Sequence, residues 1–77
     1  MKYLVYAESH ELPSEGMYFE TSSAMNAARE YAAYLNGRFP LIYHYEMRVV
    51  LNHNTLQQTD MRFTVDIELN YIAKEKA

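Results

Sequence analysis

The chain has 77 residues, with seven Lys and Arg against ten Asp and Glu, a formal net charge of -3 and no cysteine. A chain this short forms one small domain with a thin margin of stability, so we expect residues 1–77 to fold as a single unit. The acidic balance argues against nonspecific binding to nucleic acid, and the lack of cysteine excludes disulfides and thiolate metal sites. No apolar run approaches the length of a membrane span and no secretory signal is visible, so we expect a cytoplasmic protein without membrane association.

The first 20 residues predict two strands joined by a loop. Residues 2–8 carry apolar side chains on both faces of an extended strand, which is typical of a central rather than an edge position. Residues 9–16 are rich in turn formers and acidic groups, and they predict a loop. Residues 17–20 predict a second, short strand.

A helix is expected over about residues 23–36. Thr21 or Ser22 provides the N-cap, the Asn-Gly pair ending at Gly37 provides a left-handed end, and Pro40 prevents continuation. One side of the helical wheel is apolar and consists mainly of small side chains: Ala24, Ala28, Tyr31 and Leu35, flanked by Ala27, Ala32 and Tyr34. Small side chains let a helix lie close to a sheet, so we interpret this segment as a packing helix.

Two later stretches, Leu41–Leu51 and Met61–Tyr71, alternate apolar and polar side chains almost without error. Such alternation predicts a long antiparallel hairpin with one apolar and one polar face, joined by a polar loop over residues 52–60. Residues 73–77 are expected to fray. The whole pattern predicts an α+β fold in two layers, in the order ββαββ, with one helix packed on one face of a four-stranded, largely antiparallel sheet.

The predicted helix is too short to cover the predicted hairpin. Eleven extended residues span about 36 Å, whereas fourteen helical residues span only about 21 Å. If the helix crosses the base of the hairpin, near Leu41 and Tyr43, the far end of the apolar face is left in water. We therefore predict a partner-binding surface made of Tyr45, Met47, Val49, Leu51, Leu56, Met61 and Phe63. The alternative is that twist or a bulge shortens the hairpin and that Leu12 and Met17 cover its tip.

The polar face of the hairpin carries a histidine among carboxylates: His44, Glu46, Asp66 and Glu68. Such groups could bind a metal or transfer protons, but they stand on an open sheet surface, as solvated charges do. We expect the register that places Arg48 opposite Asp66 and His44 opposite Asn70, because it separates like charges. His10 lies among loop carboxylates in a second group of this kind. Because no nucleophile motif or phosphate-binding loop accompanies these groups, we predict a protein that is not an enzyme and holds no metal or cofactor.

These observations favour a non-catalytic interaction module that binds a partner protein stoichiometrically. A homodimer is the commonest way to cover an apolar surface of this kind. Small acidic domains without catalytic signatures are frequent among phage and mobile-element accessory proteins, so inhibition of a host defence complex is one concrete form of this function. The alternative is a nucleic-acid-binding regulatory protein that uses cations and stacking groups of the polar face: Arg48 and Arg62, with Tyr6, Tyr18 and His53.

Overall fold

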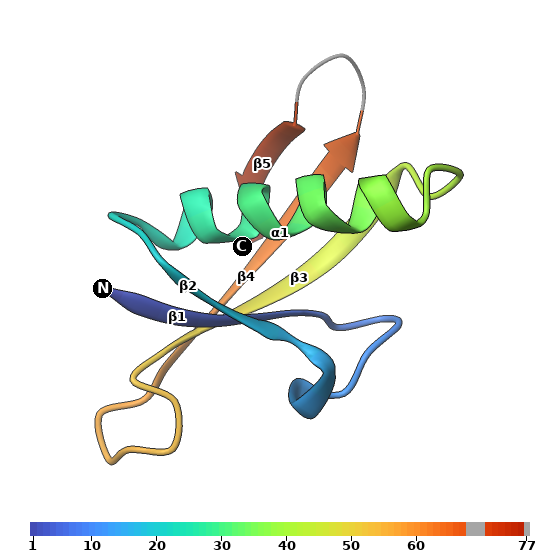
Figure 1. Ribbon diagram of the computed structural model, residues 1–77. Coiled ribbons are helices and arrows are strands. Elements are labelled where there is room, and N and C mark those ends of the chain that lie inside the picture. The colour runs from blue at the N-terminus through green and yellow to red at the C-terminus, as the bar shows by residue number, and fades with distance from the viewer. Residues whose placement is uncertain (68–70, 77) are drawn as a thin grey trace.

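The computed structural model describes residues 1–67 and 71–76, and it forms one helix packed on an antiparallel five-stranded sheet (Figure 1). The elements in chain order are β1 (Lys2–Ala7), β2 (Met17–Glu20), α1 (Ala24–Arg38), β3 (His44–Leu51), β4 (Thr59–Ile67) and β5 (Tyr71–Glu75), with a 3-10 turn at Pro13–Glu15. The strand order across the sheet is β2-β1-β3-β4-β5, so β1 is central as expected. The predicted α+β class with a helix on one face of the sheet is confirmed.

The number of strands was predicted wrongly, because the order is ββαβββ and not ββαββ. The stretch expected to be one strand from Met61 divides: β4 ends at Ile67, and β5 starts at Tyr71 and runs back along β4. Ala73–Glu75, part of the segment expected to fray, are therefore paired with β4, and the backbone N–H of Lys76 donates to the carbonyl of Arg62 at 3.0 Å. Alternation did not reveal the reversal because each of two paired strands keeps the period of two.

The ends of α1 also differ from the prediction. Ser23, and not Thr21 or Ser22, is the N-cap, and its side chain accepts the backbone N–H of Asn26 at 3.1 Å. At the other end the helix continues to Arg38, because Gly37 has no left-handed backbone and stays helical. No helix among residues 1–67 and 71–76 has the length and apolar character that crossing a membrane requires.

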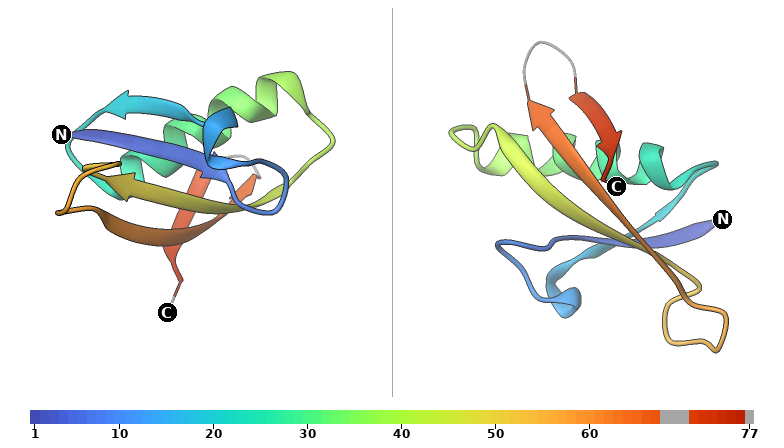
Figure 2. Two further views of the ribbon diagram at one scale, coloured as in Figure 1. Left: turned by 90° about the horizontal axis from the view of Figure 1, so that it is seen from below. Right: turned by 180° about the vertical axis from the view of Figure 1, so that it is seen from behind.

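The helix packs against all five strands, and it crosses β3, β4 and β5 obliquely near the base of the hairpin (Figures 1 and 2). The core between helix and sheet contains the small helical residues Ala24, Ala27, Ala28 and Ala32, with Tyr31 and Leu35. The sheet contributes alternate side chains to the same core: Tyr3, Val5 and Ala7 from β1, Tyr45, Met47 and Val49 from β3, and Phe63, Val65 and Ile67 from β4.

The predicted uncovered stripe is therefore mostly the core of the domain. Of its members, Tyr45, Met47, Val49 and Phe63 are buried, Leu51 and Met61 are partly buried against the core, and Leu56 is fully exposed. The expectation that the far end of the apolar face would lie in water is wrong, because β1 pairs with this part of β3 and its Tyr3 and Val5 share one core with Val49 and Phe63. The base of the hairpin is exposed instead, where Leu41 is 83% and Tyr43 62% exposed. Leu12 is also exposed and does not cover the hairpin.

The register of the hairpin differs from the expected one. His44 pairs with Asp66 and Arg48 pairs with Arg62, so that two like charges stand opposite each other. The expected register considered only β3 and β4, and it missed the carboxylate of Glu8, which directly follows β1 and lies between the two arginines. The predicted neighbour Asn70, together with Glu68, lies outside the described residues.

Candidate functional site

Two connections lie at the same end of the molecule, the one between β1 and β2 and the one between α1 and β3 (Figures 1 and 2). Between them is a pocket of about 330 Å³, which we call the end pocket. Its size is at the lower end of the range for sites that hold small ligands or single large side chains. The hairpin loop between β3 and β4, which carries Leu56, lies at the opposite end of the molecule.

The apolar wall of the end pocket comes from three elements. Ala7 ends β1, and Leu35 and Phe39 belong to the end of α1 and the residue after it. Ile42 precedes β3, and Tyr45 is the second residue of β3. The N–H of Phe39 closes the helix on the carbonyl of Leu35 at 2.7 Å. Because Pro40 cannot continue a helix, the chain turns at this point and crosses to β3.

The polar wall comes from the connection between β1 and β2, which supplies His10, Glu11 and Glu15. The Glu11 carboxylate accepts the backbone N–H of Ala7 at 2.8 Å and the hydroxyl of Tyr31, which lies 2.8 and 2.7 Å from its two oxygens. A buried helical tyrosine thus ties this connection to α1. Burial and the hydrogen bond to the Glu11 carboxylate raise the pKa of Tyr31 far above its ordinary value, so its hydroxyl remains a donor.

The hydroxyl of Tyr45 is the unusual group in the end pocket. Tyr45 is 2% exposed, and its hydroxyl oxygen has no hydrogen-bond partner within the described part of the chain. The ring of His10 meets the Tyr45 ring edge-on, with 6.2 Å between centroids. Burial, followed by the negative charge of Glu11, raises the pKa of Tyr45. A buried tyrosine hydroxyl usually has a partner, so this one lacks a hydrogen bond that such groups normally form.

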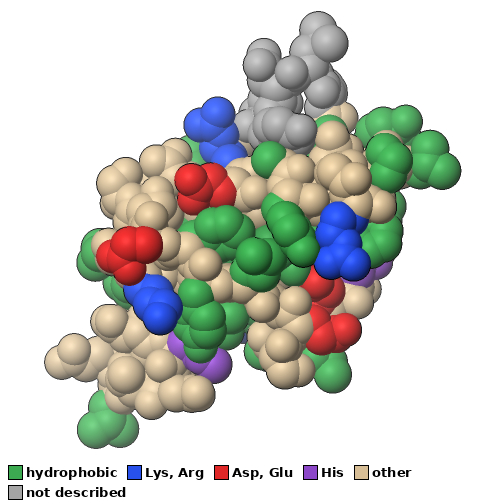
Figure 3. All heavy atoms as spheres, in the orientation of Figure 1, with side chains coloured by type: hydrophobic (Ala, Val, Ile, Leu, Met, Phe, Trp, Pro, Cys, Tyr) green, Lys and Arg blue, Asp and Glu red, His purple; other side chains and the backbone are tan. Residues whose placement is uncertain are grey.

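Exposed apolar side chains lie in the chain segment that forms one side of the end pocket. Phe39, Leu41 and Tyr43 are 49%, 83% and 62% exposed, and they belong to one short segment, residues 39–43, which we call the apolar connection. Figure 3 shows hydrophobic side chains gathered beyond the C-terminal end of α1, with a basic side chain and then acidic side chains below them. This end of the molecule therefore combines an apolar rim with a negatively charged wall.

A second hollow of about 270 Å³ adjoins the end pocket and shares Glu11, Glu15, Leu35 and Phe39 with it. Its outer side is formed by Tyr34 and Arg38. The guanidinium of Arg38 donates to the Tyr34 hydroxyl at 3.0 Å and lies 5.8 Å from the centroid of the Phe39 ring. The positive charge at this end is thus held over aromatic rings on the outer side of the second hollow.

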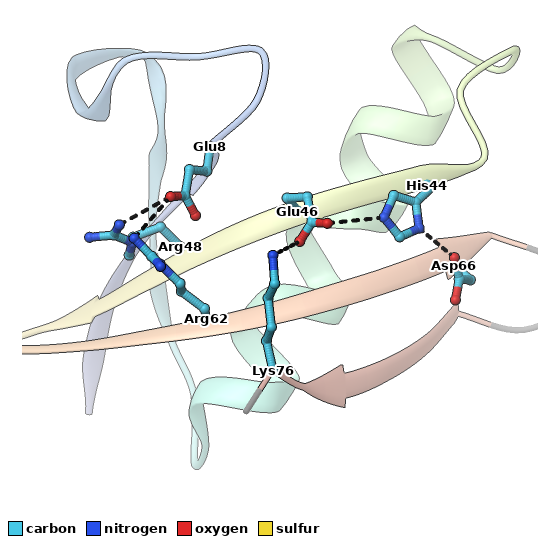
Figure 4. Close-up of polar contacts among 7 residues, drawn as sticks. All are labelled: Glu8, His44, Glu46, Arg48, Arg62, Asp66 and Lys76. Atoms are coloured by element: carbon cyan, nitrogen blue, oxygen red, sulfur yellow. Dashed lines mark hydrogen bonds and ion pairs between the residues drawn. The ribbon is translucent and has the colours of Figure 1, made fainter.

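The sheet face away from α1, which we call the open face, carries a network of ion pairs (Figure 4). Glu8 lies between two arginines, 3.1 Å from Arg48 and 3.2 Å from Arg62, and Arg48 also contacts Asp60 at 3.0 Å. The bridging carboxylate allows the two arginines to stand opposite each other on β3 and β4.

A second row on the open face runs from Lys76 through Glu46 and His44 to Asp66 (Figure 4). The hydrogen bond to Asp66 is the main cause that raises the pKa of His44, and the hydrogen bond from Lys76 lowers the pKa of Glu46. Both shifts favour the charged forms, so the row consists of alternating charges. Across residues 1–67 and 71–76, no group of three or more His, Asp or Glu side chains is arranged to hold a metal ion.

The predicted site residues are thus divided among three places. Tyr45 lines the end pocket, while Met47, Val49 and Phe63 lie inside the core, with Leu51 and Met61 at its edge. Leu56 stands alone at the far hairpin loop. The prediction did not include Phe39, Leu41 or Tyr43 as a binding surface. Their signal is the unbroken apolar run of residues 39–43 beside a proline, since a surface connection of this length usually contains polar residues.

The sequence indicates no binding role for His10 and its neighbouring loop carboxylates, but Glu11 and Glu15 line the end pocket together with His10. Sequence spacing could not show this, because Glu11 reaches Tyr31 across 20 positions of the chain. No protein-family model, curated protein or solved structure matches this chain, so the end pocket and its surroundings have no counterpart from which a role could be transferred.

Proposed function

We propose that this chain is a non-catalytic protein-interaction module that contacts its partner through the apolar connection and the end pocket. The observation that carries the proposal is the exposure of Phe39, Leu41 and Tyr43 within one five-residue segment. An apolar patch that remains in water on a small domain is typical of a binding surface. Aromatic side chains are enriched in such surfaces because they bury much area while losing few rotamers.

The charged groups on the open face support a non-catalytic role. His44 contacts two carboxylates, and its raised pKa favours the imidazolium, which is a poor general base. The cations of this face are also already paired: Arg48 and Arg62 with Glu8, and Lys76 with Glu46. This pairing disfavours the alternative function, nucleic-acid binding on the open face, because phosphate contacts need available cations.

Site-resolved photocrosslinking tests the proposal. The photoreactive residue p-benzoylphenylalanine replaces Leu41 in one variant and Leu56 in the other, and each is expressed in the cells from which the chain comes. Both side chains are strongly exposed, but they lie at opposite ends of the molecule. We expect the variant at position 41 to form one discrete adduct that accounts for most of the chain, and the variant at position 56 to form none.

A second arm of the experiment uses the double variant Leu41→Ser and Tyr43→Ser. We expect it to keep the urea midpoint of the wild type, because both side chains are exposed, and to lose the partner. An adduct only at position 56 would contradict the proposal, and so would full partner recovery by the double variant.

Two finer forms of the function share this surface. In a homodimer the apolar connection of one copy would contact that of a second, and sedimentation would then depend on protein concentration. In a stoichiometric inhibitor, for example of a host defence complex, the adduct would contain the target. The activity of the target would then fall to zero when one equivalent of this chain is added. The mass of the adduct distinguishes these forms.

A further inference from the structure

We propose that the end pocket receives a partner segment in which a large apolar side chain is flanked by Lys or Arg. The inference rests on the proposed function and states which peptide chemistry the pocket selects. It combines two independent features, the unpartnered hydroxyl of Tyr45 and the carboxylates of Glu11 and Glu15.

The hydroxyl of Tyr45 indicates a polar contact with the occupant. A hydroxyl that is buried without a partner loses its bonds to water and gains none in return, so phenylalanine would serve the core better. A ligand N–H beside it would restore the missing hydrogen bond. Because Glu11 lies close enough for its charge to affect Tyr45, the same N–H is favoured further when it carries positive charge.

The two carboxylates retain capacity for such a donor. Glu11 accepts the N–H of Ala7 and the hydroxyl of Tyr31, and Glu15 accepts the N–H of Leu12 at 2.8 Å. An ionised carboxylate offers about four acceptor positions, so both can accept more. Within residues 1–67 and 71–76, neither carboxylate forms an ion pair, in contrast with Glu8 and Glu46 on the open face.

The volume and the walls of the end pocket suit one large apolar side chain. A cavity of about 150 Å³ accommodates benzene, and the end pocket has about 330 Å³. Tyr45, His10 and Phe39 provide rings against which an aromatic group can pack. The specificity expected is therefore for an aromatic or long aliphatic residue next to a cation.

The second hollow sets the direction of the segment. Arg38 on its outer side would repel a bound cation and would favour carbonyl groups of the peptide backbone. The cationic side chain is therefore expected on the side of Glu11 and Tyr45, while the following backbone passes over the second hollow.

A peptide titration followed by amide chemical shifts tests the inference on the whole chain. The probe is a synthetic pentapeptide, blocked at both ends, with a central phenylalanine between lysine and arginine. One control peptide has glutamates in place of both cations, and another has alanine in place of phenylalanine. We expect the probe to bind at least tenfold more tightly than either control, with shifts concentrated in residues 7–15 and 35–45.

Three variants test how the Tyr45 hydroxyl and the Glu15 charge contribute to peptide binding, independently of protein stability. Tyr45→Phe should keep or raise the urea midpoint, because it removes a buried unpartnered group, yet weaken binding of the probe about fivefold or more. Tyr18→Phe is the matched control, because its hydroxyl contacts His53 instead, and it should leave binding unchanged. Glu15→Gln keeps an acceptor for Leu12 but loses the charge, and it should also weaken binding.

Equal binding of the basic and acidic peptides would overturn the inference, as would equal binding by wild type and Tyr45→Phe. Concentration-dependent sedimentation that Tyr45→Phe abolishes would assign the pocket to a second copy of the chain and would also overturn it. A crosslink at position 41 without peptide binding would leave the proposed function intact and remove only this inference.

Discussion

Gly16 stands where β2 approaches β1 so closely that a side chain does not fit. A Cβ atom at this position would lie 2.2 Å from the carbonyl oxygen of Val5 and 2.9 Å from the Cβ of Tyr6. We predict that Gly16→Ala lowers the free energy of unfolding by about 1–3 kcal/mol, because backbone must move to relieve the clash. Urea denaturation measures the change.

The second glycine of the chain provides the matched control. Gly37 lies in the last turn of α1 with open space around it. Gly37→Ala should raise the free energy of unfolding by about 0.5–1 kcal/mol, because alanine restricts the unfolded chain and favours the helix. Equal effects of the two substitutions would contradict the close approach of β2 to β1.

Glu8 bridges two facing arginines on the open face, and its negative charge should contribute to the free energy of unfolding. Glu8→Gln keeps the size of the side chain but leaves Arg48 and Arg62 opposite each other without a bridging charge. We expect the free energy of unfolding to fall by about 1 kcal/mol at low salt and by less in 1 M NaCl, where salt screens the charges. The effect is limited because Arg62 is half exposed. Urea unfolding at the two salt concentrations measures both values.

Glu20→Gln is the control for Glu8→Gln. Glu20 is highly exposed and pairs with the chain's amino terminus at 3.1 Å. Its substitution should change stability little at either salt concentration, since exposed pairs of this kind contribute close to nothing. A loss as large as that of Glu8→Gln would show that bridging between the arginines is not what stabilises the sheet.

At the scale of elements, the last strand is held by charge as well as by its ladder. Lys76 follows β5 and contacts Glu46 on β3, which contacts His44, and His44 in turn contacts Asp66 on β4. The folded protein raises the pKa of His44 above its value in the unfolded chain. The contribution of His44 to stability is therefore complete below about pH 6.5 and is lost as pH rises through the folded-state pKa.

We predict that the stability difference between wild type and His44→Gln is larger at pH 5.5 than at pH 8.5. The difference should be a few tenths of a kcal/mol, because His44 is more than half exposed and solvent screens the pair. Urea unfolding at both pH values measures it. In a Glu46→Gln and Asp66→Asn background the difference should no longer depend on pH, and a persistent dependence would exclude these carboxylates as its cause.

The elements themselves were largely predictable from the sequence, but their ends and their pairing were not. The alternation of β3 and β4 and the alanine face of α1 follow from local side-chain periodicity, and both are confirmed. The end of β4 and the register depend on contacts made elsewhere, such as that of Glu8, the residue after β1, with Arg48 and Arg62. Local sequence carries no information on a bridge that spans 40 positions.

At the scale of the whole molecule, the pairing and twist of the sheet decide, together with the helix, which apolar side chains meet water. The helix lies near the base of the hairpin, but β1 pairs with the far part of β3 and shares a core with it, so that part is buried and the apolar connection is exposed instead. A comparison of element lengths cannot capture the pairing and twist of a sheet. The end pocket has the same origin, because its walls come from segments that meet only after the helix is placed.

Hydroxyl-radical footprinting of the free protein tests most directly which apolar side chains are exposed and which are buried. It compares residues of one chemical kind: Phe39 with Phe63, Tyr43 with Tyr45, and Met25 with Met47. We predict rapid labelling of Phe39, Tyr43 and Met25, and protection of Phe63, Tyr45 and Met47 by at least tenfold, because the last three are buried in the core. Labelling of Phe63 and Met47 as fast as Phe39 and Met25 would contradict the account.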